Sequence, residues 1–171
     1  GRIPSEKDPH AVDAKLIEKY GIAVSESTRA RRKKAGHANL QYLRYDRFFV
    51  IVATKGKHKF FEEEEAAVRD FRRIPLKFAG YSISYRRGGR TRDGQSDTKW
   101  HSHVAIDRRQ FLDIRSWLTE HAGRAAASEM ANAIYSLPFE AYAPIRRQLL
   151  ILLREVNRLR RSLGRSELPI E

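Results

Sequence analysis

The hydrophobic and polar positions divide the chain into short strands followed by helices. A continuous apolar run, Phe48–Thr54, ends at Lys55 and Gly56 and predicts a buried central strand. Residues 78–85 alternate between apolar and polar side chains and predict a second strand, and residues 100–107 predict a third. The polar, glycine-rich segment 86–99 between them predicts a long hairpin loop.

Helical patterns occupy most of the remaining sequence. Residues 60–73 place acidic side chains first and basic ones last, which suits the helix macrodipole, and Pro75 ends the segment. The acidic run Glu62–Glu65 is therefore interpreted as a helix start rather than a metal site. Further helices are predicted over residues 11–20, 111–121, 125–136 and 144–163.

The last of these helices is amphipathic. An apolar stripe with spacings of three and four lies on one of its faces, and arginines occupy most other positions. We expect the stripe to pack against the sheet, and a coiled-coil homodimer seam is the alternative. The stripe consists of Leu149, Leu152, Val156, Leu159 and Leu163.

These elements predict an α+β fold with a central antiparallel sheet, helices on one face, a basic N-terminal arm and a long C-terminal helix. The predicted segments are a basic N-terminal arm or helical segment over residues 1–47, an α+β core over residues 48–140, and a C-terminal amphipathic helix and tail, packed on the core, over residues 141–171.

Charge narrows the range of functions. The chain has 171 residues, 34 of them Lys or Arg and 21 Asp or Glu, which gives a net charge of +13. Such a chain attracts polyanions, because each cation that meets a phosphate releases condensed counterions. Cysteine is absent, which excludes disulfides and thiolate metal sites and favours a reducing, cytoplasmic or nucleic-acid-associated location. We expect no membrane partner, since no apolar run approaches the roughly 18 residues that a membrane helix needs.

Two basic segments are the candidate nucleic-acid contacts. The block 25–47 interleaves cations with Tyr42 and Tyr45, so it is suited to lie along a backbone and stack on bases. The hairpin 86–99 is the second segment. The predicted contact residues are Arg29, Arg31, Arg32, Lys33, Lys34, Arg86, Arg87, Arg90, Arg92 and Lys99.

The sequence His101-Ser102-His103 is the sharpest candidate for chemistry. Residues two apart in a strand share a face, so both imidazoles are expected to project together. Two neighbouring imidazoles can bind a divalent ion, which beside a phosphodiester makes phosphorus more electrophilic. Two isolated surface histidines are the alternative. The chain shows no P-loop, dinucleotide fingerprint, zinc-finger spacing or HExxH motif.

An apolar strand, a helix, a strand and then a strand bearing two histidines resembles the HUH superfamily of single-stranded DNA nucleases. That group includes rolling-circle replication initiators, relaxases and single-strand transposases of plasmids and mobile elements. The resemblance covers roughly residues 48–140. Two features depart from the family pattern: Ser102 replaces a bulky apolar residue, and no tyrosine after the histidines is followed one turn later by a lysine.

The resemblance implies a tyrosine nucleophile and a metal ion, Mg²⁺ or Mn²⁺, held by His101 and His103. Tyr135 is the favoured nucleophile and Tyr142 the alternative; a relaxase-like order would instead select Tyr20, Tyr42 or Tyr45. The third metal ligand is expected to be Asp107, with Asp93, Asp97 and His121 as further candidates.

The sequence thus supports two hypotheses. The first is a metal-dependent HUH-like endonuclease or strand transferase, which nicks single-stranded DNA through a phosphotyrosine intermediate. The second is a non-catalytic DNA- or RNA-binding protein whose binding is driven by the phosphate backbone and weakened by salt.

Overall fold

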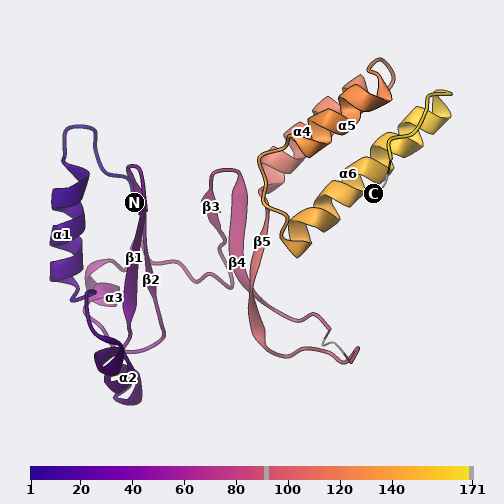
Figure 1. The fold of residues 1–171 in the computed structure, drawn as a ribbon. Helices are drawn as coiled ribbons and strands as arrows, with labels where there is room; N and C mark the ends of the chain where they lie inside the picture. Colours follow the sequence, from indigo (N-terminus) through magenta and orange to yellow (C-terminus); the bar gives the residue numbers. More distant parts are fainter. Residues whose placement is uncertain (91–92, 170–171) are drawn as a thin grey trace. The chain divides into compact units, whose positions relative to one another are not determined.

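The computed structural model describes residues 1–90 and 93–169, which form an α+β protein (Figure 1). These residues contain six helices and two small antiparallel sheets, one of two strands and one of three. The chain divides into two compact units, Gly1–Val68 and Arg69–Glu171, and each is described by itself.

Two helices precede a β-hairpin in the first unit. Asp8 begins α1 because its carboxylate accepts hydrogen bonds from the backbone N–H groups of His10 and Ala11, and Gly21, with a φ of 55°, follows the helix end. Ser25 caps α2 in the same way through the Thr28 N–H. The elements are α1 (Pro9–Lys19), α2 (Glu26–Lys34), β1 (Leu40–Tyr45), β2 (Phe48–Ala53) and α3 (Phe60–Glu63).

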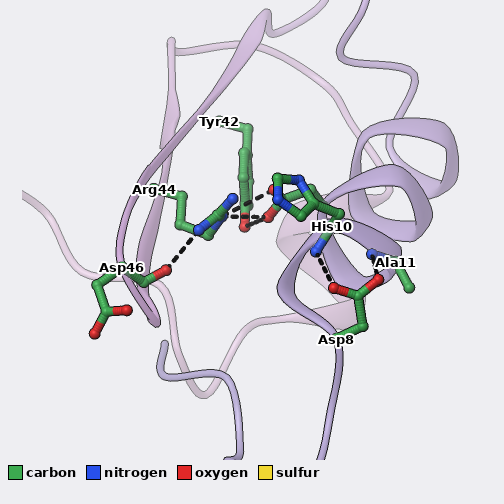
Figure 2. A network of polar contacts seen from close by, with 7 residues as sticks. Asp8, His10, Ala11, Tyr42, Arg44 and Asp46 are labelled. Carbon is green, nitrogen blue, oxygen red and sulfur yellow. Dashed lines mark hydrogen bonds and ion pairs between the residues drawn. The ribbon is translucent and has the colours of Figure 1, made fainter.

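A polar network joins α1 to the hairpin. Tyr42 and Arg44 point to the same face of β1 because they are two residues apart in the strand. Both donate hydrogen bonds to the Asp13 carboxylate (Figure 2). Arg44 also donates to the Asp46 carbonyl oxygen in the turn. The network places α1 against the face of β1 that also carries the buried side chain of Leu40.

The second unit begins with a three-stranded sheet and continues with three helices. The sheet order is β3–β4–β5, and Ala79 and Gly80, both with positive φ, make the tight turn between the first two strands. The elements are β3 (Leu76–Phe78), β4 (Tyr81–Arg87), β5 (Trp100–Ile106), α4 (Arg108–His121), α5 (Ala127–Tyr135) and α6 (Ala143–Ser162).

The core of this unit lies between the helices and one face of the sheet. Ile106 of β5 is buried there with Leu118 of α4, Met130 of α5 and Leu152 of α6. The Gln148 side chain binds the open edge of β5, because its amide oxygen accepts from the Ile106 N–H (2.8 Å) and its amide nitrogen donates to the Ile106 carbonyl (3.1 Å). The expectation that α6 packs on the sheet is therefore confirmed.

The predicted single central sheet is wrong. The apolar strand β2 pairs with β1 in the first unit, and β4 and β5 belong to a separate sheet in the second. The block 25–47, expected as a basic arm or helical segment, forms α2 and β1 within a packed unit. The prediction for this segment came from its excess of cations. Its apolar residues Ala38, Leu40 and Tyr42 nevertheless contribute to a core.

The predicted helix over residues 60–73 is also wrong beyond Glu63. A helix continued through this run would place the like charges of Glu62 and Glu65 on one face, and Lys19 of α1 binds the two glutamates between them, Glu63 at 2.8 Å and Glu64 at 3.8 Å. The chain then follows turns to β3. The strand expected over residues 78–85 is divided by the Ala79–Gly80 turn into the end of β3 and most of β4.

Among residues 1–90 and 93–169, no helix combines the length and the apolar character required to span a membrane.

Candidate nucleic-acid interface

The distal half of the β4–β5 hairpin carries exposed cations on both faces. Arg86 and Arg87 end β4, Arg90 follows, and Lys99 precedes β5; all four are exposed. Arg86 donates to the Ser84 hydroxyl (3.1 Å) and Arg87 to the Thr98 carbonyl (2.7 Å). Within the described part of the chain, none of the four forms an ion pair, so their charges are available to a ligand. The predicted contact Arg92 lies outside the described residues.

Helix α2 presents a second group of cations, in the first unit. Arg29, Arg31, Lys33 and Lys34 are exposed on it, and no described carboxylate pairs with them. Arg32 differs, since it is half-buried and donates to the Gly21 carbonyl (3.0 Å). Arg32 therefore binds the backbone at the end of α1, and only part of its side chain is exposed to solvent.

The two histidines share one face of β5, opposite the core. Register pairs His101 with Arg86 and His103 with Ser84, whereas Val104 and Ile106 face the helices. The ring of His101 contacts the Asp97 carboxylate at 2.8 Å. Partial burial lowers the pKa of His103, and the positive charges of Arg86 and Arg147 lower it further. This face thus holds imidazole and guanidinium groups together.

Asp107 is engaged elsewhere. It caps α4 by accepting from the Arg109 N–H (3.1 Å), and it forms an ion pair with Lys77 at 3.0 Å. The ion pair with Lys77 is the main reason that the pKa of Asp107 lies below its ordinary value. Of the other predicted ligands, Asp97 reaches a histidine, while His121 stacks on Trp117 in α4.

The residues fit a three-ligand metal centre poorly. In the parts of the chain that the structure describes, no three histidine, aspartate or glutamate side chains come together as such a centre. The structure instead places His101 and His103 on one face, with the Asp97 carboxylate in contact with His101.

The favoured nucleophiles lie in the second unit. Tyr135 is the last residue of α5, Tyr142 is the N-cap of α6, and both are exposed. Their exposure is compatible with either a nucleophile or an ordinary surface aromatic residue, so the assignment stays a prediction.

The relaxase-like candidates lie in the first unit. Tyr42 donates to Asp13, and partial burial together with this hydrogen bond raises the pKa of Tyr42 to about 12. Tyr20 is buried and donates to Glu64, and its pKa is raised mainly by burial. Both phenols donate to a carboxylate, and the raised pKa disfavours the phenolate that nucleophilic attack requires. Tyr45 is exposed at the end of β1.

An exposed aromatic pair was missed by the sequence reasoning. The rings of Tyr85 and Trp100 stack on the hairpin with centroids 5.8 Å apart, and the Arg72 guanidinium lies 5.6 Å from the Trp100 ring. The pair could have been predicted from the expected hairpin, because two antiparallel strands joined by residues 88–99 bring positions 85 and 100 close together.

Comparison of the chain with protein-family models, curated proteins and solved structures gives no match in any of the three. The resemblance to the HUH superfamily consequently stays a prediction that depends on element order and on the two histidines.

Proposed function

We propose that this protein binds nucleic acid through the sugar–phosphate backbone, with the β4–β5 hairpin as its main contact. The observation that carries the proposal is the set of exposed cations at the end of this hairpin, namely Arg86, Arg87, Arg90 and Lys99, none of which forms an ion pair among the described residues. Cations of this kind gain most from meeting phosphates, because their own structure does not neutralise them.

The shape of the hairpin favours the same function. Neighbouring side chains of a strand point to opposite faces, so Arg86 and Arg87 present positive charge on both sides of a two-stranded ribbon. Within the second unit, the ends of β4 and β5 that carry Arg87 and Trp100 extend away from the helices (Figure 1). A ribbon of this width fits a nucleic-acid groove or lies along a single strand.

The salt dependence of binding tests the proposal. The affinity for a labelled DNA should fall linearly on a log–log plot against salt concentration. The double variant R90Q/K99Q should lower the slope by about 1.4–1.8, since each phosphate contact contributes about 0.7–0.9. The control R115Q/R161Q removes the same net charge, but from arginines that pair with Glu155 and Glu167.

The control should leave the slope nearly unchanged. Equal slopes for the two double variants would show that the hairpin is not the contact. Binding that is insensitive to salt would overturn the proposed function as a whole.

A second candidate is the metal-dependent HUH-like endonuclease. The observation that favours it is the common face of His101 and His103, beside the positive charges of Arg86 and Arg147. The test is incubation with labelled single-stranded DNA and Mn²⁺, with EDTA as control, followed by denaturing electrophoresis. A protein–DNA adduct that Y135F or Y142F abolishes supports the enzyme, whereas binding without cleavage that H101A leaves unchanged supports the binding protein.

A further inference from the structure

One face of the β4–β5 hairpin changes from buried to exposed along its length. Near the helices it carries Tyr81, Val104 and Ile106, which pack against the core. Farther along the same face come Tyr85 and Trp100, which are 41% and 39% exposed. Two large aromatic side chains therefore continue the apolar face of the sheet into solvent.

These rings form an ordered stack. Their planes are inclined by only 15°, and their centroids are 5.8 Å apart. The Arg72 guanidinium lies over the Trp100 ring, with its carbon 5.6 Å from the ring centroid. This distance is within the range of a cation–π contact.

Arg72 is fixed in this position from two sides. Its guanidinium forms two parallel hydrogen bonds with the Asp70 carboxylate, Nε to Oδ1 at 2.9 Å and Nη2 to Oδ2 at 2.6 Å. The neighbouring Phe71 carbonyl accepts from the Tyr85 N–H at 3.1 Å, which joins this segment to β4. These contacts hold the Arg72 guanidinium beside the two rings.

We propose that Tyr85, Trp100 and Arg72 form a stacking platform for the unpaired bases of a single-stranded nucleic acid. Every base has a π-face, and aromatic and guanidinium planes bind such faces without reading sequence. Lys99, which precedes Trp100 in sequence, and Arg87, which is paired with Trp100 across the strands, supply the charge that the attached phosphates require. Duplex bases are already stacked on one another, so the platform selects single strands.

This inference rests on the proposed function and adds the class of nucleic acid to it. If the Tyr85–Trp100 pair served only to stabilise the hairpin, the protein would bind single strands and duplexes with similar affinity. The chain offers a direct readout, because it contains only two tryptophans. The second, Trp117, is 46% exposed on α4 and stacks on His121, which makes it a matched control for Trp100.

Fluorescence separates the two indoles. The variant W117F leaves Trp100 as the only tryptophan, and W100F leaves Trp117. Titration with oligo(dT) or oligo(U) should quench Trp100, a duplex of equal length should not, and Trp117 should respond to neither. An unquenched Trp100 under saturating oligo(dT) would overturn the platform, as would equal quenching by the duplex.

Affinity gives an independent measurement. W100A should weaken binding to oligo(dT) by roughly 5- to 150-fold, which corresponds to the loss of one stacked base. W100F should keep most of the affinity, and W117A should change it by less than about twofold. Duplex binding and its salt slope should be the same in W100A as in the unsubstituted protein.

The outcomes distinguish the platform from the proposed function. Salt-sensitive duplex binding with no effect of W100A on single strands would refute the platform alone. Absence of salt-sensitive binding to either substrate would refute the proposed function. The test stays decisive even if W100A unfolds the hairpin, because the platform predicts quenching of Trp100 in W117F and retained affinity in W100F.

Discussion

Replacing Arg160 tests how the C-terminal segment is held to the helices of the second unit. This side chain is only 2% exposed, and its guanidinium donates hydrogen bonds to three backbone carbonyls. The bonds reach Ala122 at 2.8 Å, Ala125 at 2.9 Å and Ser166 at 2.6 Å. Ala122 is the C-cap of α4, so the buried charge lies at the negative end of a helix dipole.

The substitution R160M keeps the aliphatic stem and removes all three bonds. At about 1.5 kcal/mol for each hydrogen bond from a charged donor, the loss is about 4–5 kcal/mol. The released desolvation cost of the guanidinium offsets part of it and leaves a destabilisation of about 3 kcal/mol. With a urea m-value of about 1.5 kcal/mol per molar, the unfolding midpoint should fall by about 2 M.

The neighbouring residue provides the control. Arg161 has a side chain that is 70% exposed and pairs with Glu167 at 2.8 Å. Exposed ion pairs contribute little to stability, so R161M should leave the midpoint nearly unchanged. Tryptophan fluorescence reports this unit specifically, since Trp100 and Trp117 both lie within it. Equal midpoints for R160M and R161M would refute the reasoning.

Three further predictions concern the geometry of the hairpin and its supports. Gln148→Leu should destabilise the second unit by about 2 kcal/mol, because it removes two hydrogen bonds to the edge of β5, and faster hydrogen exchange of β5 amides would show it. The hydrogen bonds from Arg72 lower the pKa of Asp70 to about 2, so NMR titration should find that value and R72Q should raise it toward the ordinary range; an unchanged pKa would contradict the observed pairing. His103 should titrate below an unperturbed histidine, and R86Q should raise its pKa because a nearby positive charge is removed. The lowered pKa means that the folded state favours the neutral ring, so the free energy of unfolding should decrease as pH falls through about 6.5. A stability that does not change with pH in that range would contradict this prediction.

In the first unit, the pH dependence of stability is expected to come from an acidic group, the Asp13 carboxylate. Partial burial raises the pKa of Asp13, but hydrogen bonds from Tyr42 and Arg44 outweigh it and leave the pKa below the ordinary value. Stability from this carboxylate is therefore present above about pH 4 and decreases as pH falls. D13N should remove that dependence in far-ultraviolet circular dichroism, and a persistent dependence would place its origin elsewhere.

Local patterns predicted the helices of the second unit well. The segments 111–121, 125–136 and 144–163 correspond to α4, α5 and α6 to within a few residues. Apolar spacing and nearby Gly or Pro residues are enough here, because each helix presents one apolar face to a single core. The same reasoning failed for residues 60–73, where Lys19 binds glutamates that lie more than forty positions away.

The candidate site was predicted only in part. Alternation along β5 placed His101 and His103 on one face, as expected. The sequence could not show that Asp107 caps a helix and pairs with Lys77 while Asp97 meets His101. Several carboxylates lay at comparable distances along the chain, and the choice among them depends on turns.

What the sequence alone determined is the distribution of charge and the local alternation of side chains, since both follow from residue identity and from the period of a helix or strand. The excess of cations and the shared face of the two histidines belong to this class. What only the tertiary structure decided is which strands pair and which distant side chains meet. The stack of Arg72, Trp100 and Tyr85 is of this second kind, because long-range contacts depend on how the chain closes its loops.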